Sequence, residues 1–266
     1  MASTNQQDNQ ATAHSTAYLE AWPVIMLFIL AYVEAVCYLG LFHTLTGYIS
    51  GATILLATEF FREDGGVITK ILVLATFVPA TFVWVIFKEH WSEWRYFTPT
   101  LFAIEAGLLL LYMVVAIHFA PLARVDAPET MLIVIISVLA MSLHNVHSLQ
   151  VMPAKAQIAI TGLFGNFASS MTHLLALLRT GKPAAVAFIS FKHLLYPLIA
   201  FFGGAFLGAF GFSSFGFIAL AGPVVALILM AASSLAAHRH VRVDALEFFL
   251  LHDHVGFQSQ ADRWIR

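Results

Sequence analysis

Residues 97–119 read FTPTLFAIEAGLLLLYMVVAIHF, and this stretch decides the fold class. Its one charged residue is Glu105. It is long enough to span a membrane, because an apolar helix of ~20 residues crosses the hydrocarbon core. The whole chain shares this character, since 60% of its 266 residues are hydrophobic and 11% are charged. So few charges cannot cover a water-facing surface. The composition therefore predicts a polytopic membrane protein of the all-α class.

The composition also excludes several classes of function. A net charge of −2 leaves no basic surface for nucleic acid. Cys37 is the single cysteine, so the chain cannot form a disulfide framework. The sequence has no P-loop, no haem-attachment motif and no Gly-x-Ser-x-Gly elbow. We therefore expect no cofactor.

Eight apolar segments alternate with polar turns. Six of them have the length of a full crossing: 23–42, 67–87, 97–119, 130–149, 184–210 and 217–237. The other two, 44–61 and 156–178, are shorter or interrupted by polar residues, and we expect short or re-entrant helices there. Lysine and arginine favour one side by nine to three whether six or eight segments cross. The positive-inside rule thus predicts both termini in the cytoplasm without fixing the number of crossings.

The chain resembles itself in two halves. Thr46-Gly47 follows an apolar segment that contains Glu34, and Thr161-Gly162 follows one that contains Asn145. Duplicated halves are common in transporters, whose sites lie at the repeat interface beside broken helices. Six crossings would make the repeats inverted, and eight would make them parallel. The expected organisation is a cytoplasmic tail over 1–21, membrane repeats over 22–119 and 129–237 joined by a linker over 120–128, and a cytoplasmic tail over 238–266.

Ionisable side chains inside apolar segments mark candidate sites, because each costs roughly 2.5–3.5 kcal/mol to insert in hydrocarbon. Glu34 lies midway along the first segment, and Lys192 in the other half is a candidate partner for its charge. A proton-coupling or substrate-binding carboxylate is one interpretation of Glu34. A structural hydrogen bond to a neighbouring helix or to broken backbone is the other.

The two Thr-Gly pairs admit two interpretations as well. Glycine permits a non-helical turn whose freed amides bind a polar group. Alternatively, small residues pack helices together, and Gly47 and Gly51 have the required spacing. The candidate substrate or proton site comprises Glu34, Thr46, Gly47, Asn145, Thr161, Gly162 and Lys192.

Four further residues are secondary candidates: Glu105, His144, His147 and His173. His144 and His147 stand three positions apart and so share one face of a helix. The chain has 12 histidines, but no ligand set has the spacing of a known metal site. No bound metal is therefore expected.

Four motifs and a glycine-rich stretch at 202–209 carry a resemblance to a known family. The motifs are Ala31-Tyr32-Val33-Glu34-Ala35, Leu45-Thr46-Gly47-Tyr48, Ala140-Met141-Ser142-Leu143-His144-Asn145 and Ile160-Thr161-Gly162. Over residues 22–237 the chain resembles the YoaK-like family of uncharacterised bacterial multi-pass membrane proteins. Glu34 stands where the family has Asp, Tyr48 where it has Asn, and His144 where it has Gln. The resemblance implies a multi-pass fold in the bacterial inner membrane and no settled activity.

Together these features favour a secondary transporter or carrier for a small solute, with its site at the repeat interface. Two alternatives stay open. One is a membrane-embedded enzyme that acts on lipid or quinone with histidine ligands, and the other is a non-catalytic accessory subunit of a membrane complex. The expected partners are the lipid bilayer, a small-molecule solute and further copies of the chain.

Overall fold

The computed structural model describes residues 22–61, 66–151, 175 and 184–236, and these residues form helices without any strand. Five helical stretches among them are long and apolar enough to cross a membrane. The predicted all-α bundle of transmembrane type is thereby confirmed. The helices are a first helix Trp22–Gly40, α2 Ile49–Glu59, α3 Val67–Trp91, α4 Phe97–Phe119, α5 Pro128–Val151, α7 Ala184–Phe215, the 3-10 helix η1 Gly216–Leu220, and a last helix over 221–236.

Most helix ends agree with the sequence-based boundaries, and α4 begins and ends at the expected residues. The expected segment 67–87 is too short, because α3 continues to Trp91. No glycine or proline lies between Pro79 and Pro99, so the polar residues after Phe87 extend the helix. The expected crossings 184–210 and 217–237 form one apolar helical stretch, Leu195–Ala236, which η1 interrupts where Gly216 has a φ of 60°.

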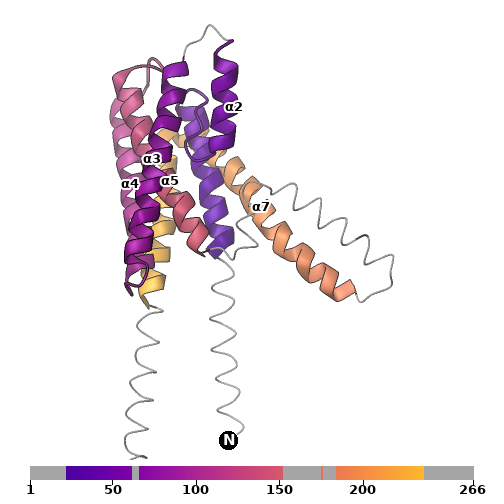
Figure 1. Ribbon diagram of the computed structural model, residues 1–266. Helices are drawn as coiled ribbons and strands as arrows, with labels where there is room; N and C mark the ends of the chain where they lie inside the picture. Colours follow the sequence, from indigo (N-terminus) through magenta and orange to yellow (C-terminus); the bar gives the residue numbers. More distant parts are fainter. Residues whose placement is uncertain (1–21, 62–65, 152–174, 176–183, 237–266) are drawn as a thin grey trace, which may run out of the picture.

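The short helix α2 does not cross the membrane. Its 11 residues rise about 16 Å, roughly half of the hydrocarbon thickness. It packs against α3, and Glu59 near its C-terminal end forms an ion pair with Lys70 in the first turn of α3. Figure 1 shows α2 (dark purple) beside the upper end of the bundle. The segment 44–61, expected to be short or re-entrant, thus contains a short helix.

Helix α5 lies at the centre of the bundle and α3 at its edge. α5 contacts both α3 and α4. Inside the bundle, 72% of the apolar window of α5 is buried, compared with 17% for α3. Large apolar side chains of α3 such as Val78, Phe82 and Ile86 are exposed, as befits a helix that faces lipid. Polar side chains of α5 are consequently forced to find partners within the protein.

Two glycines of α7 let it approach the first helix closely. A Cβ atom on Gly204 would collide with the backbone of Phe28, and one on Gly208 would collide with the backbone of Tyr32. The two glycines are four positions apart, as in small-residue helix pairs of membranes. Gly47, in contrast, precedes α2, so Gly47 and Gly51 do not form such a pair on one helix.

The two described ends of the chain lie at the same end of the bundle. Figure 1 shows the N-terminal end of the first helix and the C-terminal end of the last helix (yellow) together at the lower end. The first helix and α5 run in opposite directions in this view. The expected tails over 1–21 and 238–266 lie outside the described residues, as does the segment 156–178 except Leu175.

Candidate functional site

Glu34 is buried and holds the broken segment that precedes α2. The backbone N–H of Gly47 donates to its Oε1 at 2.5 Å, and the N–H of Thr46 lies 3.3 Å from both carboxylate oxygens. The Thr46 hydroxyl donates to Oε1 at 3.3 Å. Glu34 therefore accepts hydrogen bonds from two consecutive backbone amides, those of Thr46 and Gly47.

The local sequence explains how a segment twelve residues further along returns to Glu34. After Gly40 the chain reverses at Phe42 and His43, whose φ angles of 51° and 58° are left-handed. The amides of Thr46 and Gly47 precede α2, which begins at Ile49 after Tyr48, so they need an acceptor from outside that helix. Glu34 thus holds the non-helical segment that leads into α2. Gly47 is needed there because its Cβ would lie only 3.0 Å from Glu34 Oε1 and from Met141 Cβ.

Asn145 of α5 joins this contact from the other half of the chain. Its Nδ2 donates to the carbonyl of Gly47 at 3.1 Å and to the carbonyl of Met141 at 2.9 Å. The structure therefore brings together four of the candidates: Glu34, Thr46, Gly47 and Asn145. The structural interpretation of Glu34 included a hydrogen bond to broken backbone, and the geometry shows this bond.

Two residues of this site escaped sequence reasoning. The Thr46 hydroxyl lies 3.3 Å from the Sγ atom of Cys37, and the Tyr112 hydroxyl lies 3.4 Å from the same sulfur. Cys37 follows Glu34 by three positions, so a helical arrangement already puts both on one face. Tyr112 comes from α4, and only the packing of α4 against the first helix reveals it.

A second polar cluster joins three of the secondary candidates. His144 Nδ1 lies 2.6 Å from Oε1 of Glu105, and His147 Nδ1 lies 3.2 Å from Oε2 of the same carboxylate. The other ring nitrogen of His144 lies 3.1 Å from the carbonyl oxygen of Met26. We call Glu105, His144 and His147 the buried triad. All three side chains are almost completely inaccessible.

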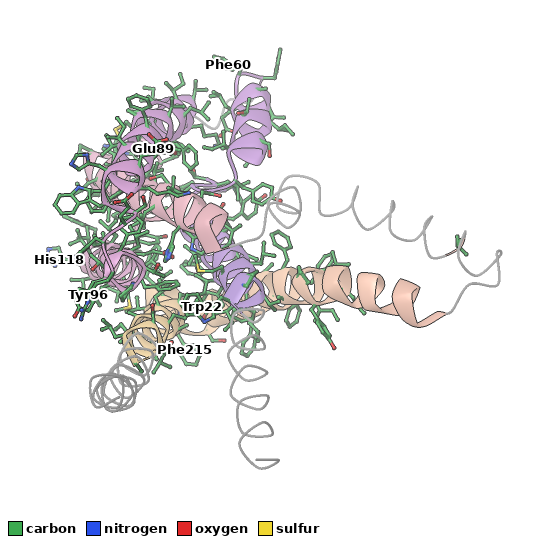
Figure 2. All side chains as sticks on the ribbon, turned by 60° about the horizontal axis from the view of Figure 1, so that its bottom comes forward. Trp22, Phe60, Glu89, Tyr96, His118 and Phe215 are labelled. Atoms are coloured by element: carbon green, nitrogen blue, oxygen red, sulfur yellow. The ribbon has the colours of Figure 1, made fainter. Side chains whose placement is uncertain are left out.

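Aromatic rings close the buried triad on one side. The ring of Phe102 lies 4.0 Å from that of His147, and Trp22 packs edge-on against Phe102 at 5.3 Å. Figure 2, which brings the lower end of the bundle forward, shows Trp22 among the helices, whereas Tyr96 and His118 lie at the outer edge. Nε2 of His147 is buried and has no hydrogen-bond partner among the described residues.

The remaining candidates are not tested by the described structure. Thr161, Gly162 and His173 lie outside the described residues. Lys192 lies on α7, but its side chain is also outside the described part, so its pairing with Glu34 stays a prediction.

Within the described residues, no group of three His, Cys, Asp or Glu side chains is arranged to hold a metal ion. The buried triad illustrates the reason. Both Nδ1 atoms point at the carboxylate oxygens at hydrogen-bond distance instead of converging on a common point.

Neither candidate site opens into the two hollows found on the described surface. One, of about 390 Å³, lies along α3 around Pro79 and Trp84. The other, of about 530 Å³, lies near Gly40, Pro121 and Phe215. Glu34 is 6% exposed and Glu105 is 0% exposed. The structure therefore shows both sites closed to water.

The sequence of the chain matches a known protein family. Residues 23–233 match the model of a family described as "Protein of unknown function (DUF1275)". The chain belongs to this family. Both the Glu34 site and the buried triad of this DUF1275 protein fall within the matched range. The match is consistent with the resemblance to YoaK-like proteins, although the family description carries neither that name nor an activity. No curated protein and no solved structure matches the chain.

Proposed function

We propose that this DUF1275 protein is a secondary carrier of the bacterial inner membrane that moves a small polar solute, with both termini in the cytoplasm. The observation that carries the proposal is the contact of Glu34 with Thr46 and Gly47. Backbone that is not helical is tolerated at membrane depth only where it is buried in protein or lines a cavity. Discontinuous helices of this kind form the binding sites of many transporters.

The four assembled candidates suggest how such a carrier works. In the observed state Glu34 occupies the amides of Thr46 and Gly47 just before α2, while Asn145 holds the carbonyl of Gly47 from the opposite half. When α2 moves away from Glu34, these amides and the Thr46 hydroxyl become donors for a polar solute. The observed structure then corresponds to the closed, empty state.

The proposed carrier has two inverted repeats. The opposite directions of the first helix and α5 support this arrangement. Thr161-Gly162 would then break the equivalent segment in the second repeat. The glycine contact of Gly204 and Gly208 with the first helix joins the two halves.

A second candidate function is that of an accessory subunit in a membrane complex. The observation that favours it is that Glu34, Thr46 and Asn145 all form hydrogen bonds within the protein. A permanently closed bundle needs no solute. The experiment must therefore ask whether water reaches the site during the working cycle.

The single cysteine makes this experiment possible without engineering. Cys37 Sγ is buried and lies 3.3 Å from Thr46 Oγ1, so opening the Glu34 site exposes it. A membrane-impermeant methanethiosulfonate is added to inside-out and right-side-out vesicles, and labelling is compared with that of protein unfolded in SDS. A carrier shows labelling from at least one side without denaturant. The Cys37→Ser variant provides the background.

The contrary outcome is equally clear. If Cys37 is labelled only after unfolding in SDS, the site does not open at that residue. A Thr46→Cys, Cys37→Ser double variant then places the thiol on the broken segment itself. If this second thiol is also protected from both sides, the carrier proposal is wrong and the accessory role is favoured.

A further inference from the structure

The hydrogen bonds of the buried triad fix where its protons lie. Met26 presents a carbonyl oxygen to Nε2 of His144, and a carbonyl can only accept, so Nε2 carries a hydrogen. His147 presents Nδ1 to Oε2 of Glu105. If His147 is neutral and this nitrogen donates, its Nε2 is left with a free lone pair.

One further proton lies between Glu105 and His144. Nδ1 of His144 and Oε1 of Glu105 are 2.6 Å apart, which requires a hydrogen between them. Either His144 is an imidazolium beside a carboxylate, or a neutral His144 accepts from a carboxylic acid. Both forms give the triad a net charge of zero. Loss of this proton leaves a nitrogen lone pair facing a carboxylate oxygen, so the contact becomes repulsive.

No other charge in the described structure compensates the triad. Among the described ion pairs, Glu105 pairs only with the two histidines of the triad, and Lys70 pairs with Glu59. From the first helix, Glu34 is bonded to Thr46 and Gly47. The other ionisable groups on the three helices around it lie nearer the helix ends: Lys88, Glu89 and His90 of α3, His118 of α4, and Glu129 of α5. The net charge of the triad therefore changes when the proton shared by Glu105 and His144 binds or leaves.

The unpartnered nitrogen of His147 offers an entry for that proton. His147 is 0% exposed, yet its Nε2 faces no described donor or acceptor. When the triad has lost its shared proton, a proton that binds Nε2 makes His147 an imidazolium, which then gives its Nδ1 proton to Oε2 of Glu105. His147 returns to neutrality with its hydrogen on Nε2. A half-turn of the carboxyl group then brings the protonated oxygen to Nδ1 of His144, which restores the shared proton and the net charge of zero.

We propose that Glu105, His144 and His147 form a proton-binding site, with His147 as the entry, and that the proton is the ion that drives the carrier. This inference rests on the proposed function. Met26 and Glu34 are about 12 Å apart along the first helix, so the triad and the Glu34 site are separate. The link between them is α5, where His144 belongs to one site and its neighbour Asn145 bonds Gly47 in the other.

The decisive variant is Glu105→Gln. Its amide nitrogen can donate to Nδ1 of His144 and its oxygen can accept from Nδ1 of His147, so both contacts survive without the shared proton. The matched control is Glu129→Gln, which removes a carboxylate in the first turn of α5. Folding is verified by size exclusion in detergent, and His144→Gln removes the other partner of the shared proton if Glu105→Gln does not fold.

Two measurements are made between about pH 5 and 8, the range in which histidine normally changes charge. The first is the rate of Cys37 labelling in each variant divided by the rate in the native protein at the same pH, because both contain the same buried thiol. We expect this ratio to change severalfold with pH for Glu105→Gln and to stay flat for Glu129→Gln. The second is the ¹⁵N resonance of His144 Nδ1 in histidine-labelled protein, identified by its loss in His144→Gln. We expect it to shift with pH in the native protein and in Glu129→Gln, but not in Glu105→Gln.

The outcomes separate the two proposals. If Cys37 and the Thr46→Cys thiol never react, the carrier fails, and the His144 resonance still decides whether the triad binds a proton. If Cys37 reacts with the same pH dependence in the native protein and in Glu105→Gln, the carrier stands and the coupling role of the triad is wrong. A His144 resonance that does not move with pH in the native protein overturns the proton site itself.

Discussion

Replacing Glu34 measures how much the short helix α2 depends on a carboxylate from another helix. Glu34→Ala leaves the amides of Thr46 and Gly47 without an acceptor in a dry bundle. An unsatisfied buried donor costs about 1–3 kcal/mol, so the two amides together cost about 2–6 kcal/mol. Glu34→Gln keeps an oxygen for the 2.5 Å contact with Gly47 but removes the charge. Charge-assisted bonds are roughly twice as strong as neutral ones, so we expect a loss of about 1–2 kcal/mol.

The measurement is equilibrium unfolding in mixed micelles of dodecyl maltoside and SDS, followed by tryptophan fluorescence. Thr46→Val is the control, since it removes only the hydroxyl bonds at 3.3 Å and keeps both amide bonds. The expected order of destabilisation is Glu34→Ala, then Glu34→Gln, then Thr46→Val. A Glu34→Ala protein within about 0.5 kcal/mol of the native stability, the usual effect of a surface substitution, would refute the role of Glu34 in holding Thr46 and Gly47.

Two further predictions concern the packing of the bundle and use the same unfolding measurement. Gly204→Ala should cost about 1–3 kcal/mol of unfolding free energy, because its Cβ meets the Phe28 backbone. Gly203→Ala is the control and should be neutral or stabilising, because the atom nearest to its Cβ is Phe28 Cε2 at 3.9 Å. Equal losses for the two variants would contradict the close helix contact. Lys70→Met should cost up to about 3 kcal/mol because it leaves Glu59 unpaired at 12% side-chain exposure, and the Lys70→Met, Glu59→Gln double variant should recover most of that loss. A double variant less stable than Lys70→Met would show that the ion pair is not what joins α2 to α3.

The sequence predicted the fold class and the shortness of α2 because both depend on local composition. Long apolar stretches can only be satisfied in lipid as helices. The segment 44–61 is short and carries Thr44, Thr46, Gly47, Ser50 and Gly51, which disfavour a continuous span. The end of α3 was harder to place, because polarity at Lys88 signals the membrane surface and not the end of hydrogen bonding.

The candidate residues were named from the sequence alone, but their grouping was not. Buried ionisable residues are costly wherever they lie, so Glu34, Glu105 and His144 stand out in an apolar chain. Which of them meet depends on how helices rotate against each other. His144 and Asn145 are adjacent in sequence, yet they point about 100° apart around α5. One completes the buried triad and the other holds Gly47.

Composition and local pattern thus determined that this is a membrane bundle, where its helices lie and which polar residues need an explanation. Only the tertiary structure decided that Glu34 binds the amides of Thr46 and Gly47, that Glu105 joins two histidines, and that Gly204 and Gly208 let α7 approach the first helix. The physical reason is that hydrophobicity acts on each segment by itself, whereas a hydrogen bond or a close backbone contact needs two segments that are distant along the chain.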